Sequence, residues 1–414
     1  MSTRCDAIVI GAGVAGGTAA ILLARAGWSV AVVEKSVFPR RKVCGECIAA
    51  TNLTLLDALG IGAEVAALAG PQLERVALYV GDETVIADLP PLRGKHPPWG
   101  RALGRERLDA LLLQRARDAG AAVWQPWTAK EIRRDGDGYA CRVAASATGE
   151  EAELRATVLI GANGSWEPAP YGTQRRPPAK PSDLFAFKAN FAEATLAPGL
   201  LPVLAFAGGY GGMVIADDGR LTLACCVRRD RLREWRAATP GAAGAAVQRL
   251  LEESCAGVRT ALLGARREGA WLGVGPIRPG IRAAWDARTG FAIGNAAGEA
   301  HPILGEGISM AIQSAALLCR ELGQRRAAAL RGDHLPIARA YARAWRRQFR
   351  SRIRFAALLA QLAMHPRGGA WLLPLLRRWP PLLTAAARIG GKVRPLPDVA
   401  PHAEPGPAPA YNGS

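Results

Sequence analysis

The chain opens with apolar segments separated by a glycine-rich turn. Residues 5–10 predict a buried strand, residues 17–26 a helix, and residues 28–33 a second apolar strand. The turn between the first strand and the helix reads Gly-Ala-Gly-Val-Ala-Gly at 11–16. This order of strand, glycine turn, helix and strand predicts a dinucleotide-binding unit of the Rossmann type.

Each position of this unit has a physical role. Gly11 permits the tight turn, Gly13 lets a pyrophosphate approach the backbone at the positive end of the helix, and Gly16 allows close packing of the helix on the strand. Glu34, which ends the second strand, can accept hydrogen bonds from a ribose. The predicted cofactor residues of this unit also include Val14, Ala15 and Lys35.

Two further glycine turns follow apolar strands later in the chain. The strand at 158–160 leads into Gly-Ala-Asn-Gly-Ser at 161–165, and the strand at 290–293 leads into the longer segment 294–308. The helix predicted at 309–318 begins in Gly-Glu-Gly-Ile, so its free N–H groups and positive dipole end face the turn. Such a helix start suits the N1–C2 edge of a flavin, which becomes anionic on reduction. The predicted cofactor residues in these turns are Asn163, Gly164, Gly294, Asn295, Gly305, Gly307 and Ile308.

Together, the three glycine motifs resemble those of the flavoprotein monooxygenase superfamily that includes para-hydroxybenzoate hydroxylase. Lys-Val-Cys-Gly-Glu at 42–46 and Pro-x-x-Gly-Glu-Gly-Ile at 302–308 resemble its geranylgeranyl reductase-like branch more closely. The resemblance covers residues 5–325 and implies bound FAD, a two-domain fold and redox chemistry at the flavin. It also implies that Arg105, on a predicted helix, contacts FAD.

The sequence departs from this family at two positions. Asn163 and Asn295 stand where the family usually has Asp, which keeps a carbonyl acceptor and removes a charge. The Trp-x-Trp signature of flavin-dependent tryptophan halogenases is not visible, which disfavours halogenation.

The predicted fold class is α/β (α+β), with a Rossmann-like FAD-binding domain, an interleaved β-sheet substrate domain and a C-terminal helical segment. Strand-like runs at 74–80, 185–191 and 221–227 predict the substrate-domain sheet. The expected boundaries are 1–75, 100–180 and 286–330 for the FAD-binding domain, 76–99 and 181–285 for the substrate-binding domain, 331–394 for a basic helical region and 395–414 for a disordered tail.

Composition and charge narrow the possible partners. The 414 residues are 50% hydrophobic and 21% charged, which disfavours global disorder, and the net charge is +18. Residues 320–394 hold 17 Arg and Lys against two acids, so the charge is regional. A basic, apolar and interrupted segment is too short and too charged to span a bilayer but suits an anionic membrane surface. The alternative is a helical cap on the FAD-binding domain, in which helix 341–362 has apolar positions at Trp345, Phe349, Ile353, Leu358 and Leu359.

Nucleic acid is not an expected partner, because no binding-fold signature accompanies the charge. Eight cysteines are an ordinary number for this length, and residues 7–33 lack a convincing signal-peptide cleavage site. We therefore expect a reducing, cytoplasmic location, with peripheral contact at the inner face of the membrane as the open alternative. The oligomeric state stays open.

Three residues are candidate catalytic groups. Cys44 begins a Cys-x-x-Cys at 44–47, which forms either ordinary pocket thiols or a disulfide that relays electrons to flavin. His301 adjoins the late motif, where an imidazole acts as acid or base or lines the cavity. Tyr210 lies in Gly-Gly-Tyr-Gly-Gly at 208–212, which presents an aromatic ring to substrate or forms a hairpin turn. No metal site is expected, since no second Cys or His pair has ligand spacing.

The leading functional hypothesis is an FAD-dependent oxidoreductase that uses NADPH or NADH and hydroxylates a lipophilic aromatic or polyketide-type substrate. The alternative is a reductase of a prenyl or polyketide double bond. A third possibility is a non-catalytic flavin electron carrier at the membrane.

Overall fold

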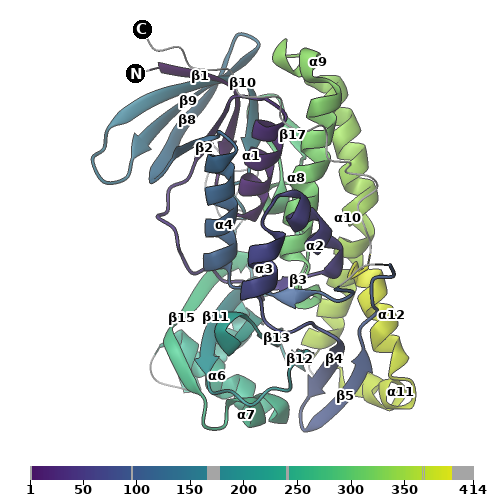
Figure 1. The fold of residues 1–414 in the computed structure, drawn as a ribbon. Coiled ribbons are helices and arrows are strands. Elements are labelled where there is room, and N and C mark those ends of the chain that lie inside the picture. The colour runs from purple at the N-terminus through teal and green to yellow at the C-terminus, as the bar shows by residue number, and fades with distance from the viewer. Residues whose placement is uncertain are drawn as a thin grey trace.

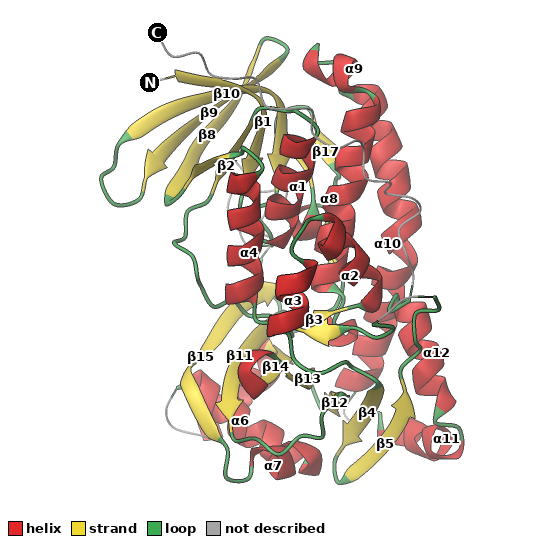
Figure 2. Cartoon of the chain, viewed as in Figure 1, coloured by secondary structure: helices red, strands yellow, loops and turns green. Residues whose placement is uncertain are grey.

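The computed structural model describes residues 2–94, 97–165, 178–238, 242–365, 367 and 369–393. Two sheets lie one above the other in Figure 1, and we call them the upper and lower sheets. The long helix α10 (Leu335–Met364) runs beside both, as the red helices of Figure 2 show. The predicted mixed α/β fold with a C-terminal helical segment is confirmed.

The upper sheet is parallel at its centre. Strand β1 lies between β10 and β2, so that Val9 is opposite both Ile160 and Val32. Two antiparallel strands, β8 and β9, continue from β10. The strands of this sheet are β1 (Ser2–Ile10), β2 (Val30–Val33), β7 (Ala122–Trp124), β8 (Trp127–Asp135), β9 (Gly138–Ala145), β10 (Glu151–Gly161), β17 (Trp285–Asp286) and β18 (Gly290–Ala292).

Helices α1 (Val14–Arg25), α4 (Arg105–Asp118) and α8 (Gly307–Gln324) pack on one face of the upper sheet. Helix α1 begins three residues earlier than predicted, directly at the glycine turn, with Gly13 as its N-cap. Tyr139 and Val143 of the β8–β9 hairpin cover the other face. Smaller elements complete this half: β3 (Cys47–Ile48), β6 (Arg101–Ala102), β16 (Gly280–Ile281), β19 (Gly298–Glu299), α2 (Ala50–Ala58), α3 (Gly62–Leu68) and α9 (Arg326–Leu330).

The lower sheet has the order β15-β11-β14-β13-β12-β4-β5 and is antiparallel except for the β12–β4 pair. Helices α5 (Arg229–Ala238), α6 (Ala243–Ser254) and α7 (Ala256–Leu262) cover one of its faces. Its other face, which includes Tyr210 and Cys226, packs toward the C-terminal part of α10. The strands are β4 (Arg75–Val80), β5 (Glu83–Asp88), β11 (Leu184–Ala192), β12 (Leu200–Phe206), β13 (Gly209–Ile215), β14 (Leu221–Arg228) and β15 (Arg266–Ile277).

The C-terminal helices differ in detail from the prediction. Helix α10 starts at Leu335 rather than 341, because Pro336 occupies its first turn, where no N–H donor is needed. Trp345 and Phe349 are buried as predicted, whereas Leu358 is 52% exposed. Helices α11 (Leu373–Arg378) and α12 (Pro381–Gly390) follow, and α12 contacts β5 and α10. The predicted tail at 395–414 lies outside the described residues. Across the described ranges, no helix is both long enough and apolar enough to cross a membrane.

Candidate active site

A cavity of about 430 Å³ lies between the two sheets and the C-terminal helices. Residues from all three glycine motifs line it, although they are far apart in sequence. The predicted site residues on its wall are Gly13, Val14, Ala15, Cys44, Arg105, Gly164, Tyr210, Gly294, Asn295, His301, Gly305, Gly307 and Ile308. The fold therefore brings most of the predicted cofactor and catalytic residues together.

Five predicted cofactor residues belong instead to the described residues outside the cavity wall: Gly11, Gly16, Glu34, Lys35 and Asn163. Gly11 has φ +99°, and a Cβ at Gly16 would lie 1.8 Å from the Gly11 carbonyl oxygen, so both shape the turn. The buried Glu34 carboxylate accepts hydrogen bonds from the Ala12 and Ser36 amides at 2.9 and 2.8 Å. Glu34 thus holds the glycine turn against the end of β2.

The cavity wall offers space and donors that fit FAD. Helices α1 and α8 both begin at this wall, so the amides of their first turns are directed at the cavity. At Gly307 an added Cβ would meet no heavy atom of the described residues within 4 Å, and at Gly13 the nearest is Arg105 Nη2 at 3.4 Å. We call Gly13, Arg105, Gly305 and Gly307 the flavin cradle.

Arg105 is held in place by an acid on its own helix. Its Nε and Nη2 each donate a 2.8 Å hydrogen bond to the fully buried Asp109 carboxylate. Burial opposes the charge, but Asp109 and the Cys44 thiol together raise the pKa of Arg105. The guanidinium is therefore a fixed cation beside the start of α1, where an anionic diphosphate would bind.

Lys42 is a second cation that the sequence analysis did not single out, although it begins the 42–46 motif. Burial, Arg105 and Arg40 lower the pKa of Lys42 to about 8, while Asp109 and Glu34 act in the opposite direction. A cation surrounded by other cations gains from a bound anion, so Lys42 also fits a diphosphate.

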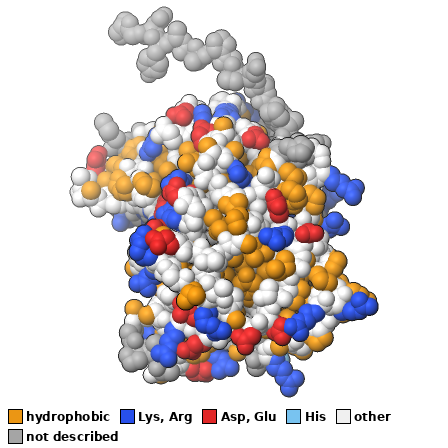
Figure 3. Space-filling view, turned by 60° about the horizontal axis from the view of Figure 1, so that its bottom comes forward, with side chains coloured by type: hydrophobic (Ala, Val, Ile, Leu, Met, Phe, Trp, Pro, Cys, Tyr) orange, Lys and Arg blue, Asp and Glu red, His pale blue; other side chains and the backbone are white. Residues whose placement is uncertain are grey.

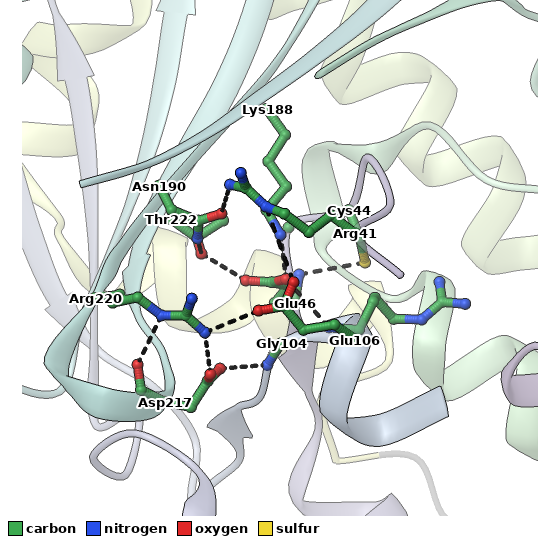
Figure 4. Close-up of polar contacts among 12 residues, drawn as sticks. Arg41, Cys44, Glu46, Gly104, Glu106, Lys188, Asn190, Asp217, Arg220 and Thr222 are labelled. Atoms are coloured by element: carbon green, nitrogen blue, oxygen red, sulfur yellow. Dashed lines mark hydrogen bonds and ion pairs between the residues drawn. The ribbon is translucent and has the colours of Figure 1, made fainter. Parts of the chain in front are cut away.

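The first turn of α4 contacts a loop of the lower sheet and Glu46 (Figure 4). The Gly104 amide donates to Asp217 Oδ1 at 2.6 Å, and the Arg105 amide donates to Glu46 Oε1 at 3.2 Å. Glu46 also pairs with Lys188 of β11 and accepts a 2.5 Å hydrogen bond from Thr222 Oγ1 of β14. Two acids at a helix N-terminus complement its dipole, and here they place Arg105 relative to the lower sheet.

The two cysteines of the 44–47 motif are free thiols. The Glu46 amide donates to Cys44 Sγ at 3.3 Å, and Cys47 Sγ is 3.3 Å from the Gly45 carbonyl oxygen. Burial raises the pKa of Cys47 to about 11, so this thiol stays protonated near neutral pH. Pocket thiols and an electron-relaying disulfide both stay predictions for this motif.

Tyr210 and His301, which were predicted separately, meet in the cavity. Tyr210 Oη lies 3.1 Å from His301 Nδ1. Burial raises the pKa of Tyr210 well above its usual value and lowers the pKa of His301 to about 4. Both groups are therefore neutral near pH 7. When the Tyr210 hydroxyl donates this hydrogen bond, His301 Nδ1 accepts it and the imidazole carries its proton on Nε2.

The glycines around Tyr210 have two different functions. The hairpin turn includes Gly208, which has φ +77°, while Tyr210 is in strand β13. A Cβ at Gly209 or Gly211 would strike Phe206 or the Ala224 carbonyl at 2.1 and 2.7 Å, so these two serve packing. Gly212 shares the strand face of Tyr210 and lies on the cavity wall, where a Cβ would be 3.1 Å from the Pro202 carbonyl oxygen.

The late motif contains a buried polar cluster that explains one departure from the family. The Asn295 Nδ2 group donates to Ser165 Oγ at 3.0 Å and to Glu299 Oε1 at 3.1 Å. Arg282 Nη2 is 3.3 Å from the other Glu299 oxygen. An aspartate at 295 would face the Glu299 carboxylate, whereas the amide supplies a donor. The sequence analysis did not single out Glu299, although it lies within the segment 294–308.

Residues 4–336 match the family described as FAD binding domain, and the chain belongs to this family. It is similar to a tryptophan 2-halogenase of Chondromyces crocatus (32% identity over 158 residues) and to a menaquinone reductase of Mycobacterium tuberculosis strain H37Rv (31% over 163 residues). A digeranylgeranylglycerophospholipid reductase of Methanothermobacter thermautotrophicus is 31% identical over 165 residues. These matches cover 38%, 39% and 40% of this chain and 30%, 38% and 40% of the relatives, so each spans well under half of either protein.

Solved structures extend the likeness over the whole fold. The myxobacterial chondrochloren halogenase CndH has a TM-score of 0.74 and 19% identity, covering 93% of this chain and 91% of its own. PqsL, a probable FAD-dependent monooxygenase of Pseudomonas aeruginosa, has a TM-score of 0.65 and 21% identity, covering 90% of this chain and 100% of its own. A geranylgeranyl bacteriochlorophyll reductase-like protein of Thermoplasma acidophilum has a TM-score of 0.68 and 16% identity, covering 94% and 100%.

The family that the three glycine motifs predicted is confirmed: the chain belongs to the FAD binding domain family. Halogenases occur among both the relatives and the fold neighbours, although the Trp-x-Trp signature is not visible in this sequence. The fold is thus shared with a halogenase, a probable FAD-dependent monooxygenase and a reductase-like protein.

Proposed function

We propose that this protein is an FAD-dependent oxidoreductase, and specifically an NAD(P)H-dependent monooxygenase that hydroxylates a lipophilic aromatic or polyketide-type substrate. The observation that supports this function is the shared cavity, onto which both the flavin cradle and the Tyr210–His301 pair open. The rest of the wall is mostly apolar and includes Val203, Met310, Leu359, Leu362, Leu376 and Leu383. Such a wall suits a lipophilic ring or chain.

FAD, when bound, supplies the two-electron redox chemistry. The protein must then orient the aromatic ring, exclude water and manage the proton of a ring hydroxyl. The Tyr210 hydroxyl and the His301 imidazole can pass that proton along their hydrogen bond. Since both groups begin neutral, the transfer leaves an imidazolium at His301 and a phenolate on the ring, and the lowered pKa of His301 favours return of the proton once the ring has reacted. Loss of the hydroxyl proton makes the ring richer in electrons and more reactive toward electrophilic oxygen.

The test is whether the oxygen atom added to the product comes from dioxygen. FAD-loaded protein is reduced with NADPH or NADH under anaerobic conditions and then given isotopically labelled dioxygen with a long-chain phenol. We expect one labelled oxygen atom in the product and bleaching of the flavin by the nicotinamide. If the label appears only in water or hydrogen peroxide with every phenol tried, the proposal that the protein is a hydroxylase is wrong.

Two tyrosine variants make the test specific. Tyr210→Phe should lower kcat by about a hundredfold and leave the FAD content unchanged. Tyr139→Phe is the matched control, because Tyr139 is also buried but donates to the Ala287 carbonyl at 3.2 Å on the far side of the upper sheet. Its turnover should equal that of the unaltered protein.

A second candidate is reduction of a prenyl or polyketide double bond. It is supported by the names of the sequence relatives, a menaquinone reductase and a digeranylgeranylglycerophospholipid reductase. In this case the product gains two hydrogens without dioxygen, and the same anaerobic incubation with a menaquinone reveals it. Either reaction uses the same cavity.

A further inference from the structure

The C-terminal helices have a cavity side and an outer side. Leu376 of α11 and Leu383 and Ala387 of α12 line the cavity. The neighbouring Trp379 and Ile389 are each 57% exposed. These two short helices are therefore the wall that separates the cavity from the surroundings.

Large hydrophobic side chains gather on the outer side of this wall. Among the described residues, eleven large hydrophobic side chains are exposed, and six of them lie between 358 and 389. We call these six the roof patch: Leu358, Trp371, Leu375, Trp379, Leu382 and Ile389. Leu382, which is 39% exposed, also reaches the cavity wall. Figure 3, which brings the bottom of the molecule forward, shows hydrophobic side chains gathered on that face, with both basic and acidic side chains around them. A concentration of this kind marks an interaction surface.

The charge around the roof patch identifies the kind of partner. Residues 334–393 contain 12 Arg and Lys and no Asp or Glu. Arg354, Arg367, Arg378 and Arg388 are exposed beside the patch, and Arg377 pairs with Glu83 of β5. Tryptophans together with basic side chains are typical of surfaces that lie in the headgroup region of an anionic bilayer. A second copy of the chain would set the same positive charges against each other.

We propose that α11, α12 and the roof patch dock on an anionic lipid bilayer. The helices have 6 and 10 residues, so they lie in the interface rather than cross it. Docking puts the inner side of the same helices, and the apolar cavity behind them, next to the acyl chains. A lipophilic ligand then reaches the cavity without passing through water. This inference concerns the route to the cavity and does not depend on which reaction follows.

Vesicle binding tests the proposal without any catalytic readout. The FAD-loaded protein is sedimented with vesicles that contain phosphatidylglycerol and with vesicles of phosphatidylcholine alone. We expect binding to the anionic vesicles that weakens as salt is added. The double variant Trp371→Ser/Trp379→Ser should bind at least about tenfold more weakly. Leu263→Ser is the matched control, because Leu263 is 78% exposed next to α7 and outside the roof patch.

Depth-dependent quenching gives a second measurement. Brominated lipids should quench tryptophan fluorescence in the unaltered protein, and Trp371→Phe/Trp379→Phe should remove that quenching while the protein stays bound. Equal binding by the serine double variant and the unaltered protein would overturn the proposal. A dimer that the double variant dissociates, without vesicle binding by either form, would identify the roof patch as a contact between copies and would also overturn it.

Discussion

Lys392 Nζ lies 3.1 Å from Glu306 Oε1, so the last described turn of the chain is tied to the residue that precedes α8. Glu306 is 1% exposed, and Arg352 Nη1 approaches its second oxygen at 4.0 Å. Burial disfavours the ammonium, but the Glu306 carboxylate raises the pKa of Lys392. The segment that follows α12 is therefore joined by a buried ion pair to the turn that contains Gly305 and Gly307 of the flavin cradle.

Removing one member of this pair should be costly. Lys392→Met leaves the buried Glu306 carboxylate with Arg352 alone, and we expect a loss of about 3–5 kcal/mol in the free energy of unfolding. Lys392→Met/Glu306→Gln should recover part of that loss, since no unpaired charge remains. Urea denaturation of the singles and the double measures the coupling. Arg388→Met, an exposed cation on the preceding helix, serves as control and should change stability by less than about 0.5 kcal/mol.

The pH dependence of stability should reveal His301. Its pKa is lowered from 6.5 to about 4 in the folded protein, so between these values the unfolded chain binds a proton that the folded one does not. The stabilising contribution is present above pH 6.5 and is lost as the pH falls toward 4, by up to about 3 kcal/mol. His301→Gln should flatten this part of the curve, and the exposed His365→Gln should not. Identical curves for all three proteins would place the titration of His301 near its ordinary pKa.

The glycines of the first turn should separate folding from cofactor binding. Gly16→Ala puts a Cβ 1.8 Å from the Gly11 carbonyl oxygen, so we expect little folded protein. Gly13→Ala meets only the end of the Arg105 side chain at 3.4 Å and should fold. Gly13→Asp should fold as well but purify without FAD, because it sets a charge against the diphosphate. Circular dichroism and the visible spectrum measure the two effects. A yellow Gly13→Asp protein would disprove the placement of FAD at this turn.

The sequence identifies the local parts of this site but not their pairing. The strands and glycine turns were predicted because each depends on neighbouring residues, and α1 and α8 begin where glycines leave room for them. Tyr210 and His301 were named separately, since 91 positions divide them and only the approach of β13 to the late motif joins them. No pattern in the sequence predicts the Glu46–Lys188 pair, because 142 positions separate the two residues.

The contribution of the C-terminal region to the cavity wall was not predicted, for the same reason. Basic and apolar positions were evident, and they suggested either a membrane surface or a cap. The cavity-facing side of α11 and α12 follows from the packing of α12 on β5, which no periodicity in a short helix can specify. Leu358 shows the limit of the pattern, because it lies on the predicted apolar face and is exposed.

Cysteine variants should distinguish a pocket thiol from a redox pair. Cys44→Ser alters a side chain that accepts from the Glu46 amide and touches Arg105, so turnover should fall severalfold without loss of FAD. Cys47→Ser should retain turnover if the two thiols act independently. Steady-state kinetics and flavin content of both variants measure this. Equal and complete inactivation of the two would instead support an electron-relaying disulfide.

Glu46 should affect the affinity of the protein for FAD, because it helps to position Arg105. The carboxylate accepts hydrogen bonds from the Arg105 amide and the Thr222 hydroxyl and pairs with the Lys188 ammonium. Glu46→Gln keeps the shape but leaves the buried Lys188 without a counter-charge, so we expect about 3 kcal/mol lower stability and weaker FAD binding. Glu46→Gln/Lys188→Met should regain stability while FAD binding stays weakened, because the carboxylate at the α4 N-terminus is still missing. Isothermal titration of the apoprotein with FAD, alongside urea denaturation, separates the two quantities. If FAD affinity followed stability in every variant, Glu46 would be a structural ion-pair partner and not a residue that positions Arg105.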